Sequence, residues 1–224
     1  MRISLPMSPG YWQLLLALPC CYFLAHLIPA RWAWENGVIE NIQVAVLVCG
    51  GVYAATVWYR NGIQGEALLA RCVLPVWLML GGRELSWGAV FLAPAGFSEQ
   101  GPWYSSQYLW YRPAVTPVLI VLLAWTLWSA YRGRLDRTVF ESIGARHMPW
   151  IEIGVVLVAA ICSSLAEQAS NALLMPSTAQ CLEELTELLG YVALVVLQSS
   201  MVRSCHGSIA GWRSTCAQRS RGLR

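Results

Sequence analysis

The sequence predicts an all-α integral membrane bundle of six transmembrane helices, and three observations support this fold class. Hydrophobic residues make up 57% of the 224 residues and charged residues only 12%, whereas soluble domains carry about 25% charged residues. Six apolar segments each have about the 17 to 25 residues that a spanning helix requires. Arginines are concentrated in alternate connections between these segments, which is the pattern of a positive-inside topology.

The six predicted spans are residues 11–28, 38–59, 72–92, 113–131, 150–170 and 182–202, and a basic tail follows over 203–224. The first span follows Arg2 and precedes small residues near Ala30, as a cleaved signal peptide also would. Its length exceeds the usual signal-peptide core of about 7 to 15 residues, which favours a retained anchor. Residues 1–202 are therefore expected to form one transmembrane domain.

The distribution of arginine predicts the orientation. With a cytoplasmic N-terminus, twelve arginines lie on the inner side and only Arg31 and Arg112 lie on the outer side, which is a strong positive-inside bias. Both termini are therefore predicted in the cytoplasm, with the chain in a bacterial inner membrane. The tail carries no acidic residue and is expected to contact anionic lipid headgroups through Arg203, Arg213, Arg219, Arg221 and Arg224.

Several other classes of protein do not fit the composition. The net charge of +3 does not indicate a nucleic-acid partner, because the arginines form no basic patch with interleaved aromatics on a soluble domain. The eight cysteines show no C-x-x-C spacing, so neither a disulfide framework nor a zinc knuckle is predicted. P-loop, H-E-x-x-H and G-x-S-x-G motifs are absent, and His26, His147 and His206 fall on opposite sides of the predicted membrane. This argues against intramembrane zinc hydrolases, including the alkaline ceramidase type.

Two adjacent charges, Arg83 and Glu84, interrupt the third predicted span near its centre. A charge at that depth costs about 2.5 to 3.5 kcal/mol on insertion scales, so an intramembrane pair indicates either a fold-holding ion pair or a functional site. Neighbours on a helix point about 100° apart. We therefore expect Arg83 and Glu84 to contact different partner helices.

Further polar residues gather in the outer halves of the other predicted spans. Helical spacing places Glu40 with Gln43 on one face, and the same rule groups residues of the fifth and sixth spans. Because such faces cannot point at hydrocarbon, they should face one another or a watery cavity. The predicted polar site comprises Arg83, Glu84, Glu40, Gln43, Glu167, Gln168, Glu184, Glu187 and His26. Its five carboxylates outnumber its one guanidinium, so some should be protonated, open to water or neutralised by a bound cation.

The string Arg83-Glu84-Leu85-Ser86-Trp87-Gly88 resembles a motif, R-E-x-S-W-G, in a central helix of uncharacterised bacterial multi-pass inner-membrane proteins. These proteins also carry glutamates at the outer starts of other helices, as this chain does near Glu40 and Glu184. The resemblance covers a small part of the chain. It implies a bacterial inner-membrane protein and no particular activity.

Three functions remain open on the sequence. Binding or transport of a small molecule or ion is favoured, although six spans without an internal repeat are few for a secondary transporter that does not oligomerise. An enzyme could act on a lipid or envelope precursor with paired glutamates; Glu184 and Glu187 would then be the best ligands for Mg²⁺ or Ca²⁺, and no other cofactor is expected. A structural or assembly role, in a homo-oligomer or a membrane complex, is the third.

Overall fold

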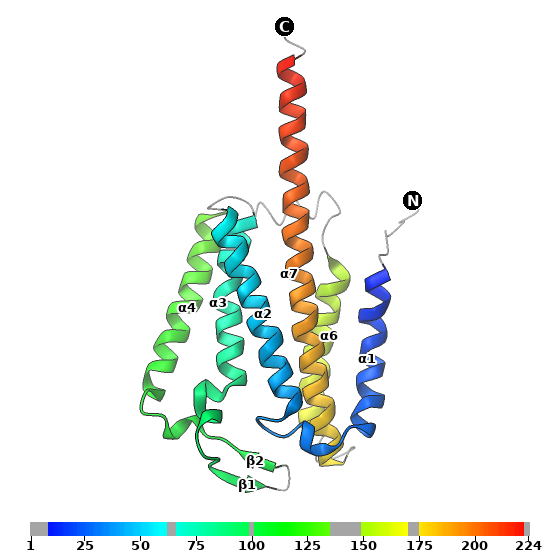
Figure 1. Cartoon of the computed structure of the whole chain (residues 1–224), viewed down its shortest axis with the longest axis vertical. Coiled ribbons are helices and arrows are strands. Elements are labelled where there is room, and N and C mark those ends of the chain that lie inside the picture. Colours follow the sequence, from blue (N-terminus) through cyan, green and yellow to red (C-terminus); the bar gives the residue numbers. More distant parts are fainter. Residues whose placement is uncertain (1–8, 62–65, 99–100, 135–148, 170–174, 222–224) are drawn as a thin grey trace.

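The structure is a computed structural model that describes residues 9–61, 66–98, 101–134, 149–169 and 175–221, with side chains for 16–60, 66–98, 101–134, 149–168 and 175–203. Its α-helices alternate in direction, so that α1 begins and α7 ends at the same end of the bundle (Figure 1). They are α1 (Pro9–Leu27), α2 (Val38–Asn61), α3 (Glu66–Glu84), α4 (Arg112–Arg132), α6 (Trp150–Ala169) and α7 (Pro176–Arg221).

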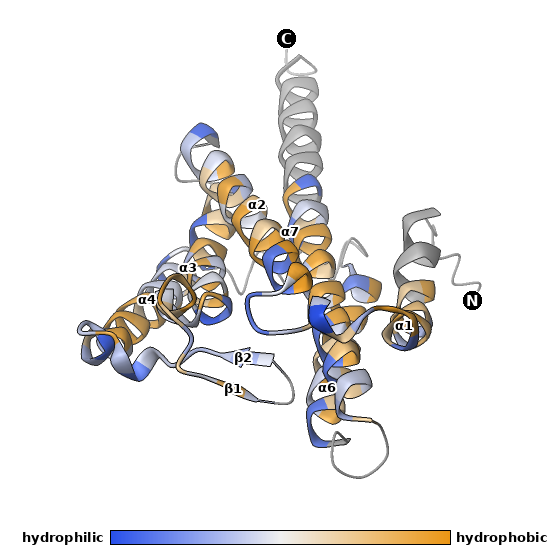
Figure 2. Cartoon of the chain, turned by 60° about the horizontal axis from the view of Figure 1, so that its bottom comes forward, coloured by the Kyte–Doolittle hydropathy of each residue, from blue (hydrophilic) through white to orange (hydrophobic). Residues whose placement is uncertain are grey.

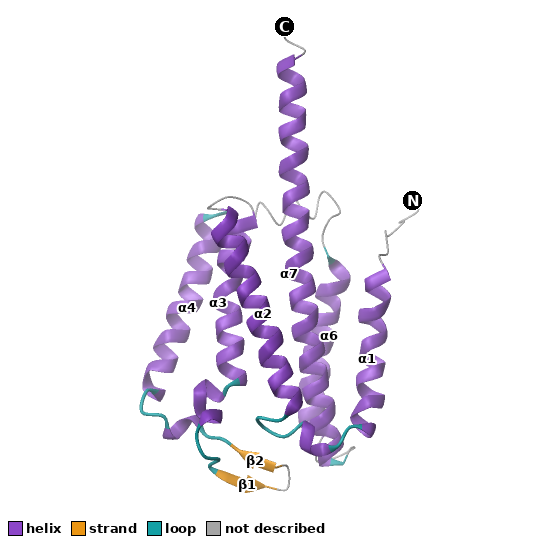
Figure 3. Cartoon of the chain, in the orientation of Figure 1, coloured by secondary structure: helices purple, strands orange, loops and turns teal. Residues whose placement is uncertain are grey.

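The connections at the other end of the bundle carry the remaining elements. Short 3₁₀ helices follow α1, α3 and the hairpin, namely η1 (Ala30–Trp32), η2 (Ser86–Phe91) and η3 (Ser106–Tyr108). Between η2 and η3 lies a two-stranded antiparallel hairpin, β1 (Gly96–Ser98) and β2 (Gly101–Trp103), at the end of the bundle where α3 stops (Figure 3). This hairpin is the one departure from an all-helical chain among the described residues.

Within the described ranges, four helices are long and apolar enough to cross a membrane: Val38–Arg60, Arg112–Arg132, Trp150–Gln168 and Pro176–Arg203. The stretch Leu16–Leu27 of α1 is apolar but shorter. The prediction of a helical membrane bundle is therefore confirmed in this coarser form, whereas the count of six spans and the orientation remain predictions.

The surface of the bundle is apolar, as contact with hydrocarbon requires. Hydrophobic residues cover most of the helices, and hydrophilic residues gather at helix ends and in connections (Figure 2). In α4 only Val115 and Ser129 are buried, whereas Ile120, Leu123 and Trp128 are exposed. Exposed apolar surface of this extent is rare on soluble monomers and is expected where lipid is the solvent.

The core is organised around α7, which packs against α1, α2, α3 and α6. Its N-terminal part joins α1 and α6 in a cluster that includes Cys21, Val155 and Leu185. Further along, Tyr191 packs with residues of α2 and α3, and Val202 closes a third cluster with both of these helices. The buried face of α2 follows helical spacing, through Ile39, Gln43, Leu47, Gly50, Ala54 and Val57.

Most predicted helix bounds hold within two residues, but two do not. The third span was expected over 72–92, whereas α3 covers Glu66–Glu84 and the chain then turns. The last helix begins at Pro176 rather than at 182 and continues to Arg221, beyond the apolar stretch. The side chains of the predicted basic tail after Arg203 lie outside the described residues, so its contact with anionic lipid remains a prediction.

Adjacent glycines in α2 provide a test of the packing between α2 and α3. A Cβ at Gly50 would lie 2.8 Å from the Trp77 ring, whereas a Cβ at Gly51 would lie 3.5 Å from the Trp77 Cβ, an ordinary contact. Trp77 is buried, and its Nε1 donates to Gln198 Oε1 at 2.6 Å, so the ring has little freedom to move. We expect Gly50→Ala to destabilise the protein by about 1 to 2 kcal/mol through overpacking.

Gly51→Ala is the matched control, because alanine raises helix propensity by up to about 1 kcal/mol without a clash. Thermal unfolding of the two variants in detergent checks this. Equal unfolding temperatures for Gly50→Ala and Gly51→Ala would contradict the tight crossing of α2 and α3.

Candidate functional site

The turn after α3 positions the central charged residues. Ser86, Trp87 and Gly88 have φ angles of 43°, 56° and 97°, a left-handed stretch that ends the helix at Glu84. Glycine adopts such a φ without strain, and a Cβ at Gly88 would also meet the Tyr111 hydroxyl. That hydroxyl donates to the Trp87 carbonyl oxygen at 2.7 Å. Arg83 and Glu84 therefore occupy the last turn of α3, and the prediction that they lie in a helix centre is wrong.

Gly82 allows this turn to fold back on the helix. A Cβ at Gly82 would lie 2.5 Å from Cζ3 of Trp87, whereas a Cβ at neighbouring Gly81 would have no atom within 4 Å. We expect Gly82→Ala to displace Trp87 and to lower stability by about 1 to 3 kcal/mol. Gly81→Ala should be neutral or slightly stabilising. Tryptophan fluorescence and thermal unfolding measure both effects, and a harmless Gly82→Ala would contradict the observed turn.

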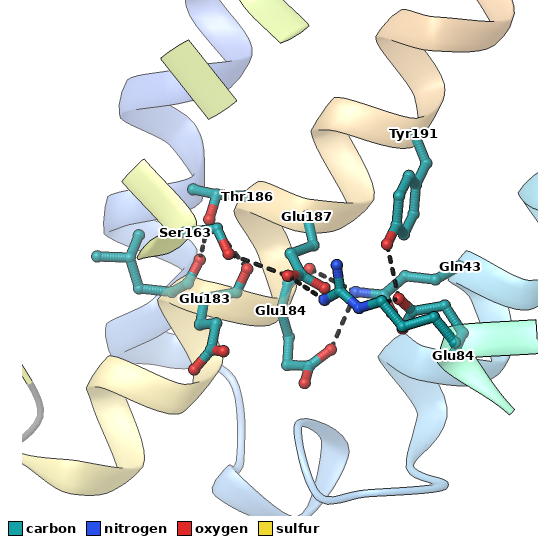
Figure 4. Close-up of polar contacts among 10 residues, drawn as sticks. Gln43, Glu84, Ser163, Glu183, Glu184, Thr186, Glu187 and Tyr191 are labelled. Atoms are coloured by element: carbon teal, nitrogen blue, oxygen red, sulfur yellow. Dashed lines mark hydrogen bonds and ion pairs between the residues drawn. The ribbon is translucent and has the colours of Figure 1, made fainter. Parts of the chain in front are cut away.

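Arg83 and Glu84 both contact α7, and the Glu84 carboxylate faces the hydroxyl of Tyr191 (Figure 4). The Arg83 Nη2 donates to Glu187 Oε1 at 2.6 Å, and Ser163 Oγ of α6 donates to the same carboxylate oxygen at 3.1 Å. Tyr191 Oη donates to Glu84 Oε1 at 2.6 Å. The Arg83 Nε lies 3.5 Å from that Glu84 oxygen. One guanidinium is thus shared between a carboxylate of α3 and a carboxylate of α7.

This arrangement corrects the expectation that Arg83 and Glu84 contact different helices. The arginine side chain is long enough to bring its guanidinium back over α7, where Glu84 also points. Burial differs along the network: the side chain of Arg83 is 59% exposed, that of Glu187 15% and that of Glu84 7%. The network is therefore shielded from solvent at Glu84 and Tyr191 and accessible to solvent at Arg83.

A second contact joins α2 to α7 beside this network. Gln43, which is 0% exposed, donates through Nε2 to both the backbone oxygen and Oε2 of Glu184, at 2.9 Å each. Its own Oε1 is buried and accepts no hydrogen bond from the residues that the structure describes. A buried acceptor without a donor is costly. The amide oxygen of Gln43 is therefore able to accept a hydrogen bond from a bound ligand that carries a donor.

The carboxylates of this region outnumber the cations that neutralise them. Glu184 interacts electrostatically with Glu187, Glu40 and Glu84. Within the described part of the chain, the ion pairs of these carboxylates are those with Arg83. Arg83 is shared by Glu84 and Glu187, whereas the half-buried Glu184 pairs with no cation among the residues that the structure describes.

Of the other predicted site residues, Glu40 lies beside this network and interacts electrostatically with Glu184. Glu40 accepts a hydrogen bond from the backbone N–H of Asn36 and so supports the turn that precedes α2. Glu167 and Gln168 are exposed. His26 is also exposed, and its Nδ1 lies 2.9 Å from the Tyr22 backbone oxygen of its own helix.

Three residues that contribute to the site were not among the predicted site residues. Tyr191 and Ser163 complete the hydrogen bonds of Glu84 and Glu187, and Tyr191 could have been chosen because it lies one helical turn after Glu187. Glu35 has a different role: its carboxylate accepts from Ser86 Oγ at 3.1 Å and from the Tyr104 N–H at 2.8 Å. It ties the turn after α3 to the segment after β2.

Glu184 and Glu187 are the carboxylates that the sequence favours as ligands of a divalent cation. In the described ranges, no group of three or more histidine, cysteine, aspartate or glutamate side chains is arranged to hold a metal ion. Comparison of the chain with protein-family models, with curated proteins and with solved structures finds no match. The geometry of the site is therefore the basis for proposing a function.

Proposed function

We propose that this chain is a multi-pass protein of the bacterial inner membrane whose Glu/Arg site binds a proton or small cation in an ion or small-molecule transport function. The observation that carries the proposal is the charge imbalance around Arg83. Glu84 and Glu187 share one guanidinium, and Glu184 beside them pairs with no cation among the described residues. Desolvated carboxylates that lack a cation must be protonated or must bind one. Glu184 is the proposed proton carrier because it has the weakest compensation.

The shared guanidinium suggests how protonation could be coupled to a change in structure. Arg83 Nη2 is 2.6 Å from Glu187, whereas Arg83 Nε is 3.5 Å from Glu84. Loss of charge on Glu187 would weaken the shorter contact and leave Glu84 as the partner of Arg83. Because Glu187 is on α7 and Glu84 on α3, such an exchange would alter the contact between these helices.

Proton flux into proteoliposomes tests this proposal. Vesicles that contain a pH-sensitive dye and an imposed potassium diffusion potential should acidify faster with the wild-type protein than without protein. Glu184→Gln and Glu187→Gln should reduce the rate to that of protein-free vesicles. Glu141→Gln, which neutralises a carboxylate in a predicted inner connection outside the described residues, is the control and should retain the flux. Wild-type vesicles no faster than protein-free ones would argue against proton transport.

A structural role is the second candidate, because Glu84 and Glu187 each accept well-formed hydrogen bonds from neighbouring helices. A packing network predicts that size-matched neutral replacements change stability alone. If Glu184→Gln and Glu187→Gln lowered the unfolding temperature equally and left the proton flux unchanged, the results would support this role.

We further propose six spans with both termini in the cytoplasm. The excess of arginine on the inner side supports this orientation, as does the alternating direction of the helices (Figure 1). Single cysteines introduced near Arg31 and Arg60, in a background without reactive cysteine, should label from opposite sides of the membrane. Labelling of both from one side would contradict the proposed topology.

A further inference from the structure

A second feature, a groove between α2 and α7, lies outside the polar network. It has a volume of about 770 Å³, within the range of about 300 to 1,000 Å³ of small-molecule sites. Its apolar walls include Ile42, Ala45 and Cys49 of α2 and Val192 and Val196 of α7. Branched valine side chains have few rotamers, so the α7 wall is stiff.

One end of the groove is polar and positively charged. Arg31 of η1 lines it together with Asn36 and Asn41. The Asn41 Nδ2 donates to the backbone oxygens of Asn36 and Gly37, at 3.1 and 2.7 Å, which fixes the turn at this end. Arg31 is exposed and forms no ion pair with any residue that the structure describes. The groove thus combines an apolar channel with a free guanidinium at one end.

The extent of the groove matches one leaflet of a bilayer. From Val38, where α2 begins, to Cys49 the helix rise gives a length of about 16 Å, compared with about 15 Å for half of the hydrocarbon core. A transmembrane helix of a second copy would require a contact along the full thickness. A lipid with its headgroup at Arg31 and its chains along the valines requires only this length.

We propose that the groove between α2 and α7 binds one anionic phospholipid, with its phosphate at Arg31 and an acyl chain between the two helices. In the proposed topology this lipid belongs to the outer leaflet. The groove and the polar network use different residues, because the buried Gln43 and Leu47 point about 100° away from Ile42 and Val46, which line the groove. The lipid is recognised by the charge of Arg31 at one end of the groove and by apolar contacts along the remainder of the groove.

Native mass spectrometry of the detergent-purified full chain tests the proposal with two probes of equal acyl chains, phosphatidylglycerol and phosphatidylcholine. The wild-type protein should retain more phosphatidylglycerol than phosphatidylcholine. Arg31→Gln should remove this preference, and Arg112→Gln, at the other arginine predicted on the outer side, should keep it. Ala45→Phe should reduce the retention of both lipids by filling the groove from an exposed position.

Three results would overturn the proposal. The first is equal retention of the two lipids by the wild-type protein. The second is a preference that survives in Arg31→Gln or disappears equally in Arg112→Gln. The third is an oxidative cross-link between copies that is lost in Cys49→Ser, because a second copy of the chain would then cover the groove. Unfolding temperatures of all variants distinguish loss of the site from loss of the fold.

Discussion

Arg83→Gln is expected to destabilise the protein more than removal of either of its carboxylate partners. The substitution leaves Glu84, Glu184 and Glu187 close together without the guanidinium that Glu84 and Glu187 share. Breaking a buried ion pair from one side costs about 3 to 5 kcal/mol, and the 59% exposure of Arg83 reduces this through solvent screening. We expect a loss of about 1 to 3 kcal/mol, measured by thermal unfolding in detergent.

The double variant Arg83→Gln/Glu187→Gln tests whether repulsion among the carboxylates causes the loss of stability. Removing Glu187 after Arg83 also removes one of the repelling charges, so the double variant should be more stable than Arg83→Gln alone. Glu187→Gln alone should cost less than Arg83→Gln, because Glu84 remains 3.5 Å from the guanidinium. A double variant less stable than both single variants would show that repulsion among the carboxylates is unimportant.

Glu35→Ala is the second large effect that we expect. Glu35 accepts hydrogen bonds from Ser86 Oγ and from the Tyr104 N–H, and hydrogen bonds to a charged group contribute about 1.5 to 3 kcal/mol each. Partial exposure reduces this, and we expect a loss of about 2 to 4 kcal/mol in total. The turn that ends α3 would lose its tie to the segment after β2, so Arg83 and Glu84 should also become less ordered. Thermal unfolding and amide hydrogen exchange near Ser86 measure the two effects.

Glu35→Gln is the matched control for this prediction. Its amide oxygen can accept from the Tyr104 N–H, and its amide nitrogen can donate to the Ser86 hydroxyl, which is able to accept as well as donate. Most of the stability should therefore return. If Glu35→Gln were as unstable as Glu35→Ala, the negative charge rather than the two hydrogen bonds would be the source of the stabilisation.

The sequence allowed most helices to be predicted, because polar or charged residues mark the ends of α2, α4 and α6. The end of α3 was missed because Leu85, Trp87 and Val90 continue the apolar composition through a left-handed turn. Hydropathy does not detect a change of backbone conformation. Gly82 and Gly88 were the available signals for a turn, since one receives the Trp87 ring and the other has a positive φ.

The candidate site was predicted in part, and the limit was the rotation of each helix. Arg83, Glu84 and Glu187 meet as expected, because α7 is central and its polar stripe faces α3. Glu167 and Gln168 are exposed because α6 buries a different stripe, which passes through Val155, Ala159, Ser163 and Ala166. Likewise α1 buries Cys21 and Ala25, so His26 lies beside the buried stripe. Spacing groups residues on a face, but only packing decides which face is buried.

Difference infrared spectroscopy of the protein in lipid is the most direct test that the carboxylates around Arg83 hold a proton. At neutral pH the wild-type protein should show the carbonyl stretch of a protonated carboxyl group. That band should be lost in Glu184→Gln and retained in Glu141→Gln. A wild-type protein without a protonated carboxyl band at neutral pH would contradict the proposed proton site.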